Sequence, residues 1–342
     1  MPASQPLRVA VVGAGAFGRN HLRVYRELEQ AGEPVQLAAV VDPNPAVAAE
    51  AAAKFGVAPF ETIEACLEAA APLDAASICV PTVHHASTAA PLLAAGLDLL
   101  IEKPLAASLA DADRILDLSR RHGRIVQAGH LERFNPAVTA ARQQLHQPMF
   151  FESHRLSVFT PRSLDVDVVL DLMIHDLDIV LSLVASPVRE VRAVGLPVLS
   201  KKVDIANVRL EFENGCVSNF TASRVSTERV RKLRFFQPHQ YLSLDFARQD
   251  LLMSDVTAAA GMDPAQLAAL AQMVGQHPSA GLSLKKISVE QGEPLRLEIA
   301  SFLNAVRTRT TPVVSGEDGR AALALALEIN RAIVAHSERA GL

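Results

Sequence analysis

A polar stripe runs along a largely apolar stretch at residues 166–184, VDVVLDLMIHDLDIVLSLV. Read at about 3.6 residues per turn, the stretch is apolar almost all the way round, which is typical of a buried α-helix. Asp171, His175 and Asp178 are spaced by four and then three residues, so they share one face of that helix. Because a buried carboxylate or imidazole is costly unless it is paired, this polar face needs a partner or a function.

Two interpretations of the polar face are open at this point. The three side chains could satisfy one another in a ladder that only helps the helix to pack. Alternatively, the carboxylates could hold the imidazole of His175 in one tautomer and direct it at a substrate hydroxyl, which is how a general base is prepared. The helix alone slightly favours packing, whereas the residues upstream favour the general base.

A lysine immediately follows a predicted buried strand in the first half of the chain. Residues 99–102 form that strand, and Lys103 precedes Pro104, which lacks a backbone donor and restricts the residue before it. Beside a hydride-transfer site, the ammonium group of Lys103 would lower the pKa of a substrate hydroxyl and stabilise the developing alkoxide. A surface lysine before a turn proline is the ordinary alternative.

A glycine-rich turn joins the first predicted strand, Leu7–Val12, to a helix predicted to end at about residue 30. The turn consists of Gly13, Ala14, Gly15, Ala16, Phe17 and Gly18. In this context Gly13 permits the tight turn, Gly15 lets a pyrophosphate approach the backbone, and Gly18 lets helix and strand pack closely. The motif alone is weak, because methyltransferases use similar glycine turns.

An acidic residue ends the second predicted strand. Residues 36–41 form that strand and lead to Asp42, which lies 24 residues after Gly18. A carboxylate at this position suits the two hydroxyls of an adenosine ribose and would repel a 2′-phosphate. The sequence therefore predicts NAD rather than NADP as the cofactor, with a solvated turn carboxylate as the alternative.

The elements that must position these residues alternate along the first half of the chain. Helices are predicted at residues 46–55, from residue 62, and at 86–95 and 109–122, and strands at 75–80, 99–102 and 124–128. Strands interleaved with helices of this length indicate a doubly wound parallel sheet, whose ligands sit beyond the carboxyl ends of the strands. Those ends carry polar segments that we expect near the nicotinamide, at residues 81–85, 102–104 and 129–130.

The second half predicts a mostly antiparallel sheet. Strands are expected at residues 150–158, 204–213, 216–225, 230–236 and 241–247. Asn214 and Gly215 supply the turn residues of a two-residue hairpin. Such a one-sided sheet leaves a broad face free to pair with another subunit. Residues 257–281 predict a small helix within a loop, and residues 295–307 and 319–340 predict amphipathic helices that pack back on the core.

Composition limits the class of protein. The 342 residues predict two domains, at 1–130 and 131–342, and 49% apolar residues are ample for both cores. Charge is nearly balanced, with 33 basic and 37 acidic residues, which gives no support to nucleic acid or an acidic membrane as a partner. Cys66, Cys79 and Cys216 have no ligand spacing, so we expect no metal site and a reducing compartment. With no leader or membrane span evident, the sequence predicts a soluble cytoplasmic protein.

Together these motifs resemble the glucose-fructose oxidoreductase and inositol dehydrogenase family, also called Gfo/Idh/MocA. The resemblance rests on Gly13 to Gly18, Asp42, Pro81-Thr82 with His85, Glu102-Lys103-Pro104, and Asp171 with His175. It covers nearly the whole chain, including the closing segments EPLRLEIASFLNAV and VVSGEDGRAALALALEINRAI. The resemblance implies an α/β protein with an N-terminal Rossmann domain, a C-terminal α+β domain with a large open sheet, and a homodimer or homotetramer formed through that sheet.

The resemblance also implies roles for individual residues. Lys103 and His175 would flank a sugar or cyclitol hydroxyl that the nicotinamide oxidises, and Asp171 would bind substrate or orient the histidine. The bond between Lys103 and Pro104 is often cis in relatives, which would hold the lysine rigidly. The implied cofactor-binding residues are Gly13, Gly15, Ala16, Phe17, Gly18, Asp42, Pro81, Thr82, His85, Glu102 and Lys103.

A narrower resemblance links GHLERFNPAV, HRLSVFTPRS and DVDVVLDLMIHDLDI to UDP-N-acetylglucosamine 3-dehydrogenases, which supply a 3-keto sugar to an aminotransferase. It implies a nucleotide-sugar substrate oxidised at C3, whose diphosphate arginines would meet, because a guanidinium binds phosphate oxygens in pairs. The candidate substrate-binding residues are Arg133, Asn135, Arg155, Arg162, Asp178 and Arg224. A free sugar or inositol substrate, and a non-catalytic NAD-binding regulatory protein, are the alternatives.

Overall fold

The computed structural model describes residues 5–70, 72–159, 166–255, 263, 265–266, 268–269, 272 and 283–341. The chain divides into two compact units. Unit 1 consists of Met1–Phe134 and Glu293–Ala324, and unit 2 consists of Asn135–Gly292 and Leu325–Leu342. Arg162 lies outside the described residues, and so does most of the helix expected at 257–281.

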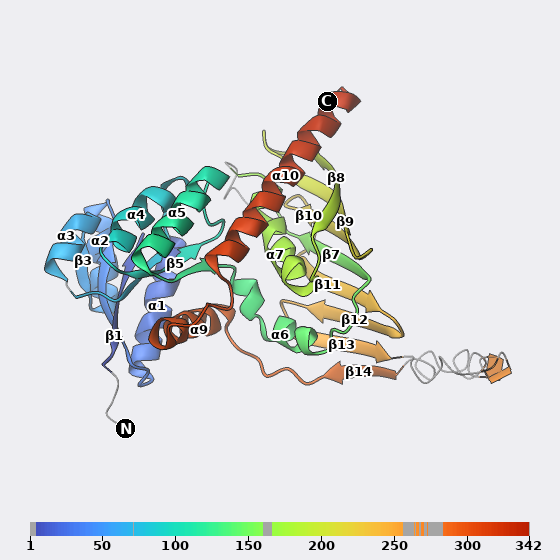
Figure 1. The fold of residues 1–342 in the computed structure, drawn as a ribbon, viewed down its shortest axis with the longest axis horizontal. Helices are drawn as coiled ribbons and strands as arrows, with labels where there is room; N and C mark the ends of the chain where they lie inside the picture. The colour runs from blue at the N-terminus through green and yellow to red at the C-terminus, as the bar shows by residue number, and fades with distance from the viewer. Residues whose placement is uncertain are drawn as a thin grey trace. The chain divides into compact units, whose positions relative to one another are not determined.

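Unit 1 is built on a six-stranded sheet in the order β3-β2-β1-β4-β5-β6 (Figure 1). Its strands are β1 Leu7–Val12, β2 Val35–Val41, β3 Ala58–Phe60, β4 Ala75–Ile78, β5 Asp98–Glu102 and β6 Val126–Gly129. Every neighbouring pair is parallel. Strand order reverses between β1 and β4, which is the point where a doubly wound sheet places its ligand.

Helices connect these strands and cover the sheet. They are α1 Ala16–Gln30, α2 Pro45–Phe55, α3 Ile63–Ala69, α4 His85–Ala94, α5 Leu109–His122 and α9 Pro294–Thr308, with short 3₁₀ turns η1 Thr82–His84 and η2 Leu131–Phe134. Local chemistry sets the helix ends, since Asn44 and Ser108 cap the first turns of α2 and α5. Although α9 comes late in the chain, it lies beside α1, and Ile299 and Phe302 join its core (Figure 1).

Unit 2 is built on an eight-stranded sheet in the order β14-β13-β12-β11-β7-β10-β9-β8. Only β7 and β10 pair in parallel, and all other neighbours are antiparallel. The strands are β7 Phe150–Leu156, β8 Val188–Leu196, β9 Ile205–Phe212, β10 Val217–Ser223, β11 Val230–Gln237, β12 Gln240–Asp245, β13 Asp250–Asp255 and β14 Ser283–Ile287. The predicted fold class, a Rossmann domain followed by a mostly antiparallel open sheet, is confirmed.

The helices of unit 2 include α6 Pro136–Gln143 and α7 Ile174–Leu183, and α10 Gly316–Ala340 contributes residues to both units. The continuous helix predicted over residues 166–184 is wrong in one respect. A π-helical segment, Val169–Met173, precedes α7, so Asp171 and His175 lie on turns of different pitch. No helix in the described part of the chain is long and apolar enough to cross a membrane.

The predicted two-residue hairpin between β9 and β10 is also wrong. The backbone N–H of Phe212 donates to the carbonyl of Cys216 at 2.9 Å, which leaves a loop of three residues. Gly215 ends this loop with φ +84°, a left-handed conformation that favours glycine. The turn chemistry at Asn214-Gly215 therefore marked the right place and the wrong loop length.

Candidate active site

The glycine turn of unit 1 is shaped by close backbone contacts. Gly13 has φ +94°, and a Cβ there would lie 2.7 Å from the carbonyl oxygen of Cys79. A Cβ on Gly18 would lie only 1.8 Å from the carbonyl oxygen of Gly13, so the start of α1 can pack on β1 only without a side chain. In contrast, a Cβ on Gly15 would meet nothing within 4 Å. Gly15 therefore leaves open space at the start of α1, which fits a pyrophosphate group.

Asp42 is held at the carboxyl end of β2. Its Oδ2 accepts from the backbone N–H of Ala14 at 2.9 Å, and its Oδ1 accepts from that of Asn44 at 2.9 Å. The carboxylate is thus tied to the glycine turn by one oxygen and to the start of α2 by the other. This geometry fits a residue that receives ribose hydroxyls next to the pyrophosphate site.

A cavity of about 740 Å³ opens at the switch point of the sheet. Four of the predicted cofactor-binding residues line it: Gly13, Gly15, Asp42 and Pro81. The sequence did not single out further lining residues at the starts of α3 and α4, namely Ile63, Glu64, Ser87 and Thr88. Their position after strand ends was the available signal. The cavity and its donors fit the adenosine and diphosphate part of a dinucleotide.

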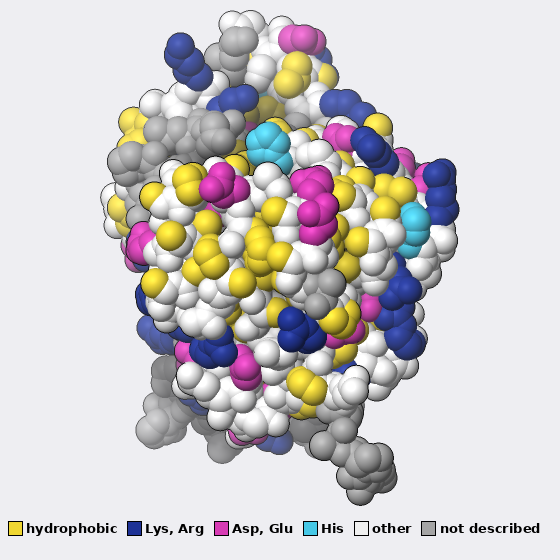
Figure 2. Space-filling view, turned by 90° about the vertical axis from the view of Figure 1, so that its left-hand side faces the viewer, with side chains coloured by type: hydrophobic (Ala, Val, Ile, Leu, Met, Phe, Trp, Pro, Cys, Tyr) yellow, Lys and Arg dark blue, Asp and Glu magenta, His cyan; other side chains and the backbone are white. Residues whose placement is uncertain are grey.

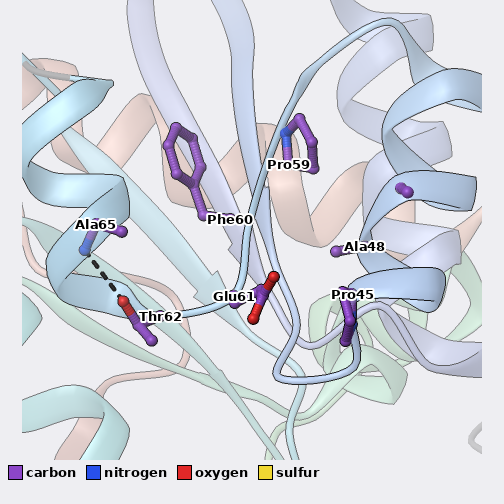
Figure 3. Close-up of a pocket in the computed structure, with 8 residues that line it drawn as sticks. Pro45, Ala48, Pro59, Phe60, Glu61, Thr62 and Ala65 are labelled. Atoms are coloured by element: carbon purple, nitrogen blue, oxygen red, sulfur yellow. Dashed lines mark hydrogen bonds between the residues drawn. The ribbon is translucent and has the colours of Figure 1, made fainter.

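A second cavity, of about 490 Å³, shares Glu61 and Thr62 with the first. Figure 3 shows Pro45 and Ala48 of α2 on one side of it, and Thr62, which precedes α3, and Ala65 of α3 on the other. The hydroxyl of Thr62 accepts from the backbone N–H of Ala65 at 3.2 Å, which caps α3 (Figure 3). The start of α3, which borders both cavities, is thus held by its own cap.

Glu102, the last residue of β5, is enclosed beside Lys103. Its Oε1 lies 2.9 Å from Nε2 of buried His21, and its Oε2 accepts from the backbone N–H of Lys103 at 3.3 Å. A Cβ on Gly129 would lie 3.0 Å from Oε1 of Glu102, so the neighbouring strand must also lack a side chain there. The Lys103–Pro104 peptide bond is cis.

Two further histidines lie close to the Lys103 segment. Nδ1 of His85 is 3.0 Å from the carbonyl oxygen of Pro104, and its Nε2 is 3.0 Å from that of Val80. Burial lowers the pKa of His85. Burial and the nearby cations of Arg133 and Lys103 lower the pKa of His130 to about 3, so its imidazole is neutral at ordinary pH. His85 therefore links the end of β4 to the Lys103–Pro104 turn through buried contacts.

In unit 2, His175 is the second residue of α7 and is half-buried, as is Asp171 in the π-helical segment. Asp178 is buried. The sequence did not single out Asp176, whose carboxylate is only 1% exposed. Asp176 accepts from Nε and Nη2 of Arg155 at 2.9 and 2.7 Å and from the hydroxyl of Ser153 at 2.8 Å. Nothing local in the sequence marks this contact.

The predicted substrate-binding residues have partners within their own units. Arg155 pairs with Asp176, and Nε of Arg224 lies 3.4 Å from Asp204. A guanidinium nitrogen of Arg133 lies 3.5 Å from Asp318. These contacts place a carboxylate beside each of the three arginines, and the role of the arginines toward a diphosphate stays a prediction.

Asn135 also has partners of its own. Its side-chain amide donates to the carbonyl of Phe246 at 3.0 Å, and its side-chain oxygen accepts from the N–H of Ala137 at 3.1 Å. The second contact caps α6, which begins at the next residue, Pro136. The predicted contact between Asn135 and substrate likewise stays a prediction.

Positive and negative side chains are mixed on one face of the molecule. On the face shown in Figure 2, Lys and Arg side chains are interspersed with Asp and Glu. A nucleic-acid-binding face would instead gather basic side chains into a stripe. Within the described ranges, no group of three or more His, Cys, Asp or Glu could hold a metal ion.

The fold and the glycine turn, Asp42 and the cavity at the switch point define an NAD-binding oxidoreductase architecture. Residues 7–130 match the oxidoreductase family with an NAD-binding Rossmann fold, Gfo/Idh/MocA, and residues 124–237 match the Gfo/Idh/MocA C-terminal domain. The chain belongs to the Gfo/Idh/MocA family of oxidoreductases, as the sequence motifs predicted.

Individual relatives extend this comparison. The chain is 34% identical over 97% of its length to UDP-N-acetylglucosamine 3-dehydrogenase from Acidithiobacillus ferrooxidans, covering 99% of that protein. The solved structure of that dehydrogenase, GnnA, superposes with a TM-score of 0.85 at 33% identity, over 97% of this chain and 99% of the other. Inositol 2-dehydrogenase from Leifsonia xyli subsp. xyli is 33% identical over 56% of this chain and 57% of its own length. The prediction that this protein is a dehydrogenase is confirmed.

Proposed function

We propose that this protein uses NAD to oxidise a secondary hydroxyl of a nucleotide sugar, C3 of UDP-N-acetylglucosamine, to the 3-keto sugar. The observation that carries the proposal is 34% identity over 97% of the chain to a dehydrogenase of that name. The same alignment length is not reached by the inositol dehydrogenase, which matches 56% of the chain. The keto sugar would then serve a reaction that adds an amine to a carbonyl.

The proposed chemistry uses the side chains of His175 and Lys103. When bound, the nicotinamide ring supplies the hydride acceptor. His175 takes the proton of the substrate hydroxyl as general base, and Asp171 orients substrate or imidazole. The ammonium group of Lys103 stabilises the negative charge that develops on the oxygen. The enclosure of Glu102, the residue before Lys103, supports a lysine whose backbone is held in place.

The proposed cofactor is NAD rather than NADP. The fixed carboxylate of Asp42 supports this choice, because it would repel a 2′-phosphate at the ribose. We expect Asp42→Ser to relax the discrimination against NADP by about tenfold, equivalent to ~1.4 kcal/mol. The ratio of kcat/KM for the two cofactors measures this effect, and an unchanged ratio would show that Asp42 does not read the ribose.

The proposed substrate and assembly are open to direct tests. Arginines, among them Arg133, would contact the diphosphate, and a homodimer or homotetramer would form through the open face of the unit 2 sheet. Outward-facing apolar side chains on that sheet, such as Phe150 and Phe236, whose ring centroids are 5.5 Å apart, support an interface. Light scattering of the purified protein, with Phe236→Lys as the variant, tests the assembly.

A substrate screen tests the function. Purified protein is mixed with NAD and, separately, with UDP-hexosamines, UDP-hexoses, free hexoses and inositol, and NADH is followed by its absorbance. We expect the highest kcat/KM with UDP-N-acetylglucosamine. Turnover of inositol alone would move the substrate to the free cyclitols. No turnover of any sugar, with NAD still bound, would favour a regulatory NAD-binding protein.

A further inference from the structure

A buried ion pair lies next to the proposed base in the sequence. Arg155 is 3% exposed and lies on β7, an interior strand of the unit 2 sheet that pairs with β10 and β11. Asp176 is 1% exposed and lies in the first turn of α7, directly after His175. Two guanidinium nitrogens reach the two carboxylate oxygens, at 2.9 Å from Nε and 2.7 Å from Nη2. Each bond of such a bidentate pair constrains the orientation of the other.

The pair is held on further sides. The hydroxyl of Ser153, two residues earlier on β7, donates to Oδ2 of Asp176 at 2.8 Å. The guanidinium carbon of Arg155 lies 5.0 Å from the ring centroid of Phe246, within the range of a cation–π contact. The carbonyl of Phe246 in turn accepts from Asn135 at 3.0 Å. Asp176 is therefore held by two side chains of β7, and Arg155 is itself packed against Phe246.

Stability alone is a weak reason for such a pair. Removing two charges from water costs several kcal/mol each, and apolar residues of similar volume often stabilise a core as well or better. A bidentate pair fixes the relative orientation of its two side chains, which an apolar contact does not. A function that depends on the orientation of a side chain is thus the better explanation for this ion pair in the core.

The local helix geometry links this ion pair to the orientation of the His175 side chain. The π-helical segment Val169–Met173 ends directly before α7 and changes the number of residues per turn. The rotation of α7 about its axis therefore differs from that of an α-helix continued through residues 169–173. In an α-helix, neighbouring side chains diverge by about 100° around the axis. Holding Asp176 against β7 therefore sets the direction in which His175 leaves the helix.

We infer that Arg155, Ser153 and Asp176 are positioning residues that aim the imidazole of His175 at the substrate. The inference rests on the proposed role of His175 as base. It also gives Arg155 a function different from the diphosphate contact predicted from the sequence. None of the three needs to touch the substrate for this role.

A double-mutant cycle tests the inference. We expect Asp176→Asn to lower kcat by about 10- to 100-fold, since displacement of a reacting group by about 1 Å can cost that much. KM for NAD should stay within about twofold. In a His175→Ala background, Asp176→Asn should lower kcat no further, because the two substitutions act through one group. An equal loss in both backgrounds would overturn the inference.

Two further variants keep the test decisive. Ser153→Ala removes only the third hydrogen bond to Asp176, so we expect a stable protein with kcat lowered a few-fold, again only when His175 is present. Leu242→Ala, at a buried position on β12, is the matched control for stability. It should lower the melting temperature while kcat stays within about twofold. Wild-type kcat in both Asp176→Asn and Ser153→Ala would contradict the positioning role.

The outcomes also separate this inference from the proposed function. If His175→Ala retains wild-type kcat, the assignment of the base fails and the positioning role fails with it. If His175→Ala is slow while Asp176→Asn is fully active, the base stands and only the positioning inference is overturned.

Discussion

Both units place a buried carboxylate next to the residue proposed to do chemistry. In unit 1 Glu102 precedes Lys103 and is contacted by His21 of α1. In unit 2 Asp176 follows His175 and is contacted by Arg155 of β7. The proposed catalytic side chains are only half-buried, whereas the carboxylates beside them lie within the fold. The fold thus anchors each chemical group through its neighbour in the chain.

The carboxylates of Glu102 and Asp176 differ in the groups that contact them. Nδ1 of His21 is buried without a hydrogen-bond partner among the described residues, and its Nε2 lies 2.9 Å from Oε1 of Glu102. Arg155 is always charged and engages both oxygens of Asp176. Glu102 thus contacts a histidine nitrogen with one oxygen and the backbone N–H of Lys103 with the other, whereas both oxygens of Asp176 meet one guanidinium.

The largest effects should come from the two half-buried groups themselves. We expect Lys103→Met and His175→Gln each to lower kcat by about 10²- to 10⁴-fold, because both the alkoxide and the proton need a partner in the transition state. Steady-state kinetics measures the loss, and calorimetry with NAD shows whether cofactor binding persists. If only one of the two variants is slow, the chemistry belongs to one unit and the comparison breaks.

The next largest effect concerns the glycine turn of unit 1. Gly18→Ala would place a Cβ 1.8 Å from the carbonyl oxygen of Gly13, so we expect it to destabilise unit 1 by about 3 kcal/mol. Gly15→Ala is the matched control, since its Cβ meets no atom within 4 Å. It should fold normally and bind NAD weakly. Denaturant unfolding and calorimetry measure both, and equal stability of the two variants would disprove the assigned roles.

The stability of the two units should also depend differently on acidic pH. The pKa of His130 in unit 1 is lowered from 6.5 to about 3, chiefly by burial, so unfolding takes up a proton below about pH 6.5. Unit 1 should therefore lose stability by roughly 1.4 kcal/mol per pH unit as the pH falls from 6.5 toward 3. Hydrogen exchange resolved by peptide measures this loss. His130→Phe should flatten the slope in unit 1, and an unchanged slope would contradict the assignment.

Asp204 gives the corresponding expectation for unit 2. Burial alone would raise its pKa, but hydrogen bonds from the Ser200 hydroxyl and the N–H groups of Ser200, Val198 and Leu199 lower it to about 2. Its contribution to stability is complete above about pH 4 and is lost as the pH falls toward 2. Asp204→Asn should remove this dependence. Loss of unit 2 stability through Asp204 at higher pH would show that the carboxylate is not held as described.

The smallest effect concerns the hydrogen bond between His21 and Glu102. His21→Gln can still donate to Glu102, so we expect kcat within about threefold of wild type. His21→Leu removes the donor from a buried carboxylate and should lower kcat by about tenfold and stability by ~1–3 kcal/mol. Kinetics and denaturant unfolding of the two variants provide the comparison. Equal kcat in both would show that the contact does not hold the Lys103 segment.

Sequence reasoning succeeded where function depends on short, local patterns. The run from Leu7 through Gly18 predicted strand, turn and helix, and Gly13, Gly15, Asp42 and Pro81 line the cavity at the switch point of the sheet. Fold class and family followed from these motifs and are confirmed. Strands β3, β8, β13 and β14 were missed. Of these, β8 and β14 lie at the edges of their sheet and carry charged residues, which weakens the alternation of apolar and polar residues.

The contacts that hold Glu102 and Asp176 could not be predicted, because they join residues distant in sequence. His21 and Glu102 are 81 positions apart, and Arg155 and Asp176 are 21 apart and lie on different elements. A helix period read across residues 166–184 assumed one pitch, so the π-helical segment and the separate orientation of Asp176 were hidden. Charge and burial alone do not reveal which arginine meets a carboxylate and which meets a ligand.

The most direct test of the account follows the hydrogen that leaves the sugar. Purified protein is incubated with NAD and UDP-N-acetylglucosamine deuterated at C3, and both products are analysed by mass spectrometry. We expect deuterium in the reduced cofactor, a 3-keto sugar as the other product, and suppression of the transfer by both Lys103→Met and His175→Gln. Reduced cofactor without deuterium, or no reduction in the presence of bound NAD, would contradict this expectation.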